Sequence, residues 1–132
     1  MKCPVCDRET DGARTCPACG ADLGALVALR ELPAQLASEG AALVQDGRVL
    51  AGVERLTAAT VLAPGEMAIR RTLVDALVVA GLDELAWNQL KTVLAADGAD
   101  PAARRAAMKL RKRMRVRAAV DRLVRAFASY VT

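Results

Sequence analysis

Two short cysteine turns at the N-terminus constrain the fold of this 132-residue chain more than any other feature: Cys3-Pro-Val-Cys6 and Cys16-Pro-Ala-Cys19. They contain all four cysteines of the sequence and are separated by nine residues. With two residues between cysteines, both sulfurs of a tight turn can point at one metal ion, and two such turns supply a tetrahedral set of four thiolates. Two disulfides are the alternative, which we do not expect, because no secretory signal peptide precedes the turns.

The residue types predict a closed, structural metal site. Tetrahedral sites made of four thiolates bind zinc or iron. A zinc ion held by four cysteines has no open coordination position for water or substrate, so it stabilises structure and does not catalyse. We therefore expect one structural zinc ion with Cys3, Cys6, Cys16 and Cys19 as its ligands.

The segment Lys2–Leu23 resembles the short bacterial zinc-ribbon family, whose pattern is CPxCG, a spacer, then CPxCG and a leucine shortly after. Here the sequence reads CPVC, DRETDGART and CPACGADL, and Asp7 stands where the family often has glycine. The resemblance covers about a sixth of the chain. It implies contact with protein or nucleic acid and names no activity. Rubredoxin turns look similar but flank a long, aromatic-rich body, whereas the nine-residue spacer here contains no aromatic residue.

The composition of the remaining chain favours an all-α fold. Apolar residues make up 54% of the sequence and are mostly Ala, Leu and Val, whereas aromatic residues make up 2%. The apolar residues recur every three or four positions and do not alternate, which predicts helices and no strand after the cysteine turns. Ala-rich faces let helices approach closely. No apolar stretch reaches the roughly 20 residues that a membrane-spanning helix needs.

Glycine and proline divide this region into predicted helices. Asp22 is a candidate N-cap of a short first helix, and Pro33 suits the first turn of the next one. Gly47, Gly81 and the Pro64-Gly65 pair are the expected helix ends. The predicted helices span Leu23–Leu32, Pro33–Asp46, Arg48–Ala63, Glu66–Ala80, Asp83–Ala96, and Pro101 almost to Thr132.

A regular period relates two parts of the helical region. Gly47 and Gly81 are each followed at equal distances by a small residue and a leucine, namely Gly52 and Leu56, then Ala86 and Leu90. The spacing between the two glycines equals the period of about 34 residues of the helix–turn–helix units in tetratricopeptide (TPR) repeats. The segments 33–66 and 67–100 therefore resemble two divergent TPR units.

The TPR resemblance is incomplete. Val74 and Val93 occupy positions where small residues are usual, aliphatic residues replace the aromatic ones, and the closing proline of the second unit comes late, at Pro101. A generic antiparallel helical bundle is the alternative. Two units need caps, which the first helix and the start of the last helix can supply. The sequence thus predicts a zinc ribbon (1–23), TPR-like helix pairs (24–100) and a basic amphipathic C-terminal helix (101–132).

In TPR geometry the first helix of each unit lines a concave surface. A groove made of small and apolar residues suits an apolar helix or an extended segment of a partner, and the chain's own last helix is the alternative occupant. The single tryptophan, Trp87, is either a core residue or an interface anchor. The predicted groove residues are Ala34, Ala37, Ala41, Val44, Gln45, Ala68, Arg71, Asp75, Val78 and Val79.

The C-terminal segment is strongly basic. Positions 101–132 contain ten Lys or Arg and one acid, a balance of +9, whereas positions 1–100 have a balance of −5, which leaves the chain a net charge of +4. Such a helix attracts phosphates, anionic lipid or an acidic protein face; a solvated helix, or one docked on the acidic remainder of the chain, is the alternative. The predicted basic surface comprises Arg104, Arg105, Lys109, Arg111, Lys112, Arg113, Arg115 and Arg117, followed by Arg122 and Arg125.

Helical spacing divides the apolar residues of this segment into two stripes, rotated by roughly a third of a turn. The first stripe would cap the repeats and consists of Ala103, Ala107, Leu110, Met114 and Ala118. The second is left over at the end of the chain and is predicted to bind another molecule. After Val116 it contains the predicted partner-binding residues Val120, Leu123, Val124, Phe127 and Val131.

The sequence gives catalysis little support. It contains no histidine and no glycine-rich phosphate loop, and its four cysteines are assigned to the metal. We expect a non-enzymatic adaptor, scaffold or accessory subunit that binds protein subunits of a larger complex, or a second copy of itself, through the C-terminal helix.

Two other classes remain as alternatives. One is a nucleic-acid-binding regulator that uses the zinc ribbon and the basic helix, although stacking aromatic residues are nearly absent. The other is a peripheral membrane anchor, because a basic amphipathic helix can lie on a membrane surface.

The abundance of arginine and alanine suggests a GC-rich bacterial genome. We expect a cytoplasmic protein, with peripheral contact to the inner membrane as the alternative.

Overall fold

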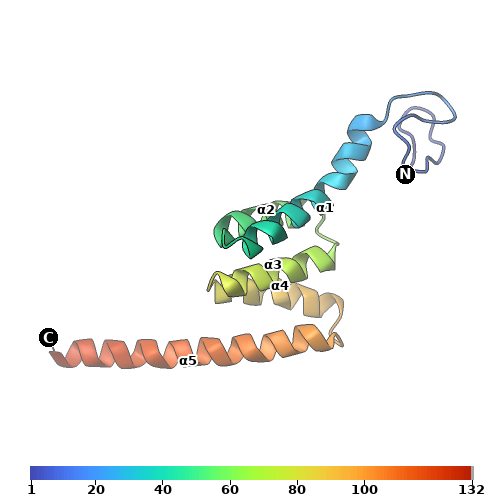
Figure 1. Ribbon diagram of the computed structural model, residues 1–132. Helices are drawn as coiled ribbons and strands as arrows, with labels where there is room; N and C mark the ends of the chain where they lie inside the picture. The colour runs from blue at the N-terminus through green and yellow to red at the C-terminus, as the bar shows by residue number, and fades with distance from the viewer. Residues whose placement is uncertain (132) are drawn as a thin grey trace.

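The computed structural model describes residues 1–131, and its regular secondary structure is entirely helical within that range (Figure 1). Five helices follow the cysteine turns: α1 (Gly24–Gln45), α2 (Val49–Leu62), α3 (Met67–Val79), α4 (Asp83–Ala96) and α5 (Pro101–Val131). Short turns make α1 and α2 antiparallel, and likewise α3 and α4 (Figure 1). The all-α prediction is confirmed. The end of the last helix near Thr132 falls outside the described residues.

The prediction of two helices before Gly47 is wrong, because α1 runs unbroken from Gly24 to Gln45 with Pro33 inside it. Proline cannot donate to the carbonyl group four residues earlier, here that of Leu29. Leu29 and its neighbour Arg30 are exposed, so water can hydrate the freed carbonyl and the helix continues. The other four helices begin and end within one residue of their predicted positions over the described range.

The backbone repeats itself from the first helix pair to the second. Gly47 and Gly81 end the first helix of each pair at φ angles of 84° and 76°, which favour glycine. The amide of each donates to a carbonyl three residues earlier at 3.1 Å, and the amide of the next residue donates to the carbonyl five residues earlier at 2.9 Å. Helix α5 starts one such period after α3. The third glycine of the series would fall at position 115, where the sequence has arginine, and α5 continues through it.

The main core lies between α2, α3, α4 and the first part of α5. Its most buried residues include Leu56, Leu73, Leu90 and Val93. Trp87 packs against this core, in agreement with its interpretation as a core residue. Helix α5 contributes only Ala103 and Leu110 as buried residues, and its C-terminal half extends past α3 and α4 (Figure 1).

Helices α1 and α2 cross at two glycines. A Cβ atom added at Gly40 would lie 2.8 Å from Leu56 Cγ and 3.0 Å from the Gly52 carbonyl oxygen. A Cβ atom at Gly52 would lie 2.7 Å from the Gly40 carbonyl oxygen and 2.5 Å from Val44 Cγ2. The backbones of the two helices therefore approach each other as closely as only glycine allows at these positions. In the second pair, Val74 and Ala86 occupy the equivalent positions.

Charged residues fix α5 against the second helix pair. Asp100 accepts hydrogen bonds from the amides of Ala102 and Ala103 at 3.0 and 3.3 Å, and its other oxygen lies 2.8 Å from Arg71 Nη2. The Ala103 amide, with Arg71, lowers the pKa of Asp100 although partial desolvation opposes the shift. Asp100 thus caps the start of α5 and ties it to α3.

A second ion-pair site lies further along α5. The Asp83 carboxylate is buried at the first turn of α4, 3.1 Å from Arg113 Nε and 3.9 Å from Arg117 Nη1. The same arginines donate to the carbonyls of Val78 at 3.3 Å and Gly81 at 3.4 Å, which belong to the end of α3 and its turn. These contacts join α5 to the end of α3 and the start of α4.

Substitution of Gly52 by alanine is predicted to destabilise the first helix pair. Overpacking costs ~1–3 kcal/mol, and we expect the upper part of this range because one of the clashing atoms is a backbone oxygen. Chemical denaturation should show a lower free energy of unfolding. Gly65→Ala is the matched control, since no atom lies within 4 Å of its added Cβ. Equal stability of the two variants would contradict the close crossing.

Candidate metal centre and docking surface

The two cysteine turns share one backbone structure, which begins at Cys3 and is repeated from Cys16. In the first, the Cys3 amide donates to the Arg8 carbonyl and the Asp7 amide to the Cys3 carbonyl, at 2.9 and 2.8 Å. In the second, the Cys16 amide donates to the Ala21 carbonyl and the Gly20 amide to the Cys16 carbonyl, both at 2.9 Å. An isolated antiparallel bridge closes each turn, Lys2 with Glu9 and Thr15 with Asp22. The segment 1–23, which we call the cysteine module, is thus built from two copies of one turn.

The four sulfurs form a compact cluster. All four Sγ atoms lie within 4.8 Å of one another, and the pairs Cys3–Cys19 and Cys6–Cys16 are 3.7 Å apart. Tetrahedral metal–sulfur bonds of ~2.3 Å place sulfurs about 3.8 Å apart. Disulfide bonds are ~2.05 Å long, and all four cysteines are free. The cysteines are therefore positioned to bind a metal ion, and the disulfide alternative does not describe this structure.

Backbone amides prepare the cluster for negative charge. The amides of Cys19 and Ala18 point at the Cys16 sulfur and lower the pKa of that thiol to about 6. The Ala21 amide acts in the same sense on Cys19, but partial desolvation and hydrogen bonds with the other three thiols raise the pKa of Cys19 to about 12. Four sulfurs this close repel one another as thiolates, and a metal cation removes that repulsion.

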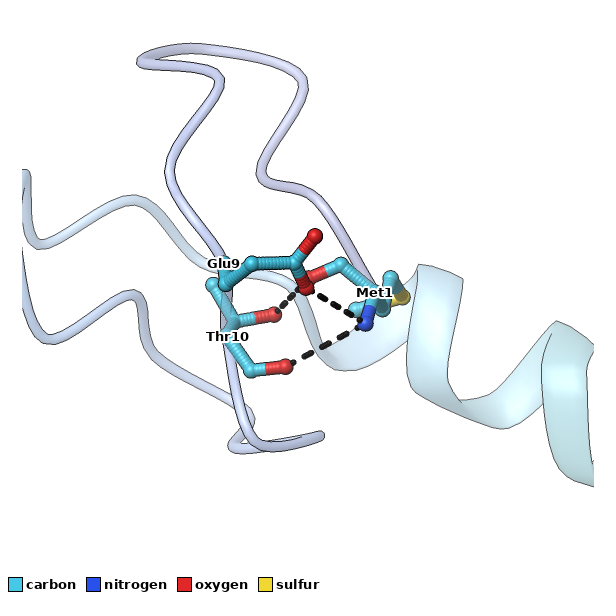
Figure 2. A network of polar contacts seen from close by, with 3 residues as sticks. All are labelled: Met1, Glu9 and Thr10. Carbon is cyan, nitrogen blue, oxygen red and sulfur yellow. Dashed lines mark hydrogen bonds and ion pairs between the residues drawn. The ribbon is translucent and has the colours of Figure 1, made fainter.

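The cysteine module is joined to α1 through a small buried cluster. Cys3, Cys16 and Leu23 are buried together, and Leu23 is also the residue before the first turn of α1. Thr10, which occupies the position of Leu23 in the first turn, is buried and donates to the Met1 carbonyl at 2.9 Å. The Met1 amino group in turn lies 3.3 Å from Glu9 Oε2 and 3.4 Å from the Thr10 carbonyl oxygen (Figure 2).

Asp7 lies in the left-handed backbone region, which favours glycine. Its φ angle is 60°, and Gly20, at the same point of the second turn, has a φ angle of 72°. The departure noted in the sequence therefore changes the side chain and leaves the backbone geometry of the turn intact. The left-handed region costs a non-glycine residue ~1–2 kcal/mol, less for aspartate than for most others.

The predicted partner-binding residues lie together on the projecting half of α5. Their side chains are between 50% and 71% exposed. This set, which we call the C-terminal stripe, consists of Val120, Leu123, Val124, Phe127 and Val131. The centre of the stripe is rotated by about a quarter of a turn from Ala103 and Leu110, which face the core. The stripe therefore does not continue the buried side of the helix.

The eight residues of the predicted basic surface are all exposed, but they do not form one patch. Arg113 and Arg117 pair with Asp83, and Arg104 donates to the Gly98 carbonyl at 2.6 Å. Sequence reasoning missed the pairing with Asp83. The remaining residues are Arg105, Lys109, Arg111, Lys112 and Arg115, for which no ion pair occurs among residues 1–131.

Comparison of the chain with protein-family models, with curated proteins and with solved structures found no match. None of the helices within residues 1–131 has the length and apolar character needed to cross a membrane.

The cysteine cluster is expected to bind one metal ion per chain. Cys16→Ala removes a buried ligand, so the metal content should fall and the cysteine module should lose its order. Helices α2 to α5 should persist, because the buried cluster of Cys3, Cys16 and Leu23 is separate from the main core. Elemental analysis and far-UV circular dichroism test both parts. Full metal content in the variant, or collapse of the helical signal, would contradict this assignment.

Asp7→Gly is expected to tighten metal binding by about fivefold, because it removes ~1 kcal/mol of backbone strain. Gly20→Ala should weaken binding, since it introduces the same strain into the second turn. Asp7→Asn is the control for charge: it removes the carboxylate and keeps a side chain that tolerates the left-handed region. Competition with a chromogenic chelator measures all three. An equal gain in Asp7→Asn would assign the effect to charge.

Proposed function

We propose that this protein is a non-enzymatic adaptor: a zinc ribbon and two TPR-like helix pairs that carry a C-terminal helix for docking to another protein. The observation that supports the proposal best is the C-terminal stripe. Five large apolar side chains on one side of a helix are exposed to solvent, on a segment that extends beyond the body. Burying each such side chain is worth ~1.5–3 kcal/mol before the cost of association.

The TPR-like assignment is supported by the recurrence of the same turn hydrogen bonds at Gly47 and at Gly81. Each repeat pair buries its apolar faces against its neighbour, and the start of α5 supplies the closing surface. In this proposal α5 corresponds to α1 and α3, as the first helix of a third repeat. Because it lacks the glycine that ends the first two, it continues into the docking segment.

Zinc is the ion we propose for the cysteine module. Within residues 1–131 the site offers four thiolates and no fifth His, Cys, Asp or Glu ligand, which suits a structural zinc ion. The resemblance of Lys2–Leu23 to zinc ribbons supports the same ion. Elemental analysis of the protein purified from cells is expected to give about one zinc per chain. Stoichiometric iron would refute this part of the proposal and leave the docking helix unaffected.

Nucleic-acid binding is the second candidate, and the ten basic residues of the C-terminal segment are the observation that favours it. Three of them contact carbonyl or carboxylate groups of the chain itself, which leaves fewer for phosphate. We expect only weak, sequence-independent binding that falls steeply with salt. A nanomolar, sequence-selective complex at physiological salt would favour this candidate instead.

The double substitution Leu123→Asp with Phe127→Asp is predicted to abolish partner binding and leave the helical content unchanged. Both residues are about 70% exposed, so the fold does not depend on them. Affinity purification from the native host, followed by mass spectrometry, compares wild type and variant. Leu50→Asp with Val61→Asp is the matched control, because these apolar residues of α2 are 66% and 73% exposed. Loss of the same partners in both variants, or in neither, would contradict the docking role of the stripe.

A further inference from the structure

A groove lies between α3 and the first part of α5, before the C-terminal stripe in the sequence. Its volume is about 480 Å³, and its apolar lining comes from both helices. The charged residues around it are mainly basic: Arg105, Lys109 and Arg113 on α5, opposite the single acid Asp75 on α3. Burial raises the pKa of Asp75, which reduces its charge relative to a solvated carboxylate at moderately low pH. Arg113 already pairs with Asp83, whereas Arg105 and Lys109 have no ion-pair partner within residues 1–131.

The groove and the C-terminal stripe lie on the same side of α5. Five turns of an α-helix contain a whole number of residues, so side chains five turns apart point in the same direction at a separation of about 27 Å. Every α5 residue of the groove except Leu110 is followed five turns later by a member of the stripe. The pairs are Ala102 with Val120, Arg105 with Leu123, Ala106 with Val124, Lys109 with Phe127, and Arg113 with Val131.

We propose that this continuous side of α5 binds an amphipathic helix of a partner protein that is apolar at one end and acidic at the other. The inference rests on the proposed adaptor function and specifies its partner. The apolar end lies along the C-terminal stripe. The acidic end lies in the groove, where carboxylates reach Arg105 and Lys109. A helix that covers both parts needs about 30 residues, since α5 spans about 44 Å between Ala102 and Val131.

Charge favours such a partner over a second copy of the chain. The C-terminal segment from Pro101 onward carries ten basic groups and one acid, so two α5 helices side by side would bring like charges together. A basic or neutral helix would leave Arg105 and Lys109 uncompensated at the edge of an apolar contact. An acidic helix removes this repulsion and gains ion pairs at the groove.

The test uses a displayed library of amphipathic helices, each about 30 residues long. In one half of each helix the side that faces α5 is fixed as Leu and Ala, and in the other half the positions that face the groove are Glu or Lys at random. The bait is the full chain loaded with zinc. Enriched sequences should carry Glu at one end. Each Glu in place of Lys there should raise enrichment about two- to fivefold, which is the contribution of a surface ion pair.

Two matched variants locate the preference. Arg105→Glu with Lys109→Glu should reverse it to Lys at that end, whereas Arg111→Glu with Arg115→Glu, which makes the same charge change outside the groove, should preserve Glu. Leu123→Asp with Phe127→Asp should remove enrichment altogether. The proposal of an acidic partner helix is wrong if the groove variant keeps the preference for Glu. It is also wrong if no sequence is enriched.

Two further measurements separate this inference from the adaptor function. A dimer in light scattering that Leu123→Asp with Phe127→Asp disrupts would assign the stripe to a second copy, and would overturn the inference. Retention on phosphatidylcholine–phosphatidylserine vesicles, lost in the same variant, would assign it to a lipid surface with the same consequence. If binding of native partners requires the stripe but not Arg105 and Lys109, the adaptor function is supported and the proposal of an acidic partner helix is refuted.

Discussion

The contact between the buried carboxylate of Asp83 and the exposed side chains of Arg113 and Arg117 holds α5 against the second helix pair. Helix α5 buries only two small or medium side chains, Ala103 and Leu110, so apolar packing alone fixes its rotation weakly. A buried carboxylate needs compensation, and Arg113 and Arg117, four residues apart on α5, both lie near Asp83. In this orientation Ala103 and Leu110 face the core and Arg105 and Lys109 line the groove with α3, whereas every residue from Val120 to Val131 is exposed.

Single residue differences at equivalent positions distinguish the two helix pairs and α5 from one another. Glycine at positions 47 and 81 allows a left-handed turn, and the chain reverses into α2 and α4. Position 115, one period after Gly81, is arginine, and α5 runs unbroken from Pro101 to Val131. The exposed stripe lies on the part of α5 beyond that position. In the first pair, Gly40 and Gly52 bring two helices into backbone contact, which the second pair does not reproduce.

The metal centre depends on a different balance. Its buried cluster contains only Cys3, Cys16 and Leu23, too little apolar burial to fold a module of this size by itself. Repeated backbone hydrogen bonds shape the two turns, and a cation would supply the remaining stability by removing repulsion among four thiolates. Leu23 connects this centre to α1, so order in the cysteine module fixes the start of the first helix.

Local signals in the sequence determined much of this structure: the two cysteine turns, the all-α body, the glycine turns at positions 47 and 81, and helix ends that lie within one residue of prediction for α2 to α4. These features depend on neighbouring residues and on helical periodicity, which a single chain displays directly. Continuity of α1 through Pro33 was not predictable, because it depends on whether the Leu29 carbonyl is hydrated. The pairing of Asp83 with Arg113 and Arg117, and the groove that α5 forms with α3, were decided only by tertiary packing, since the placement of one helix against another follows from contacts between distant residues.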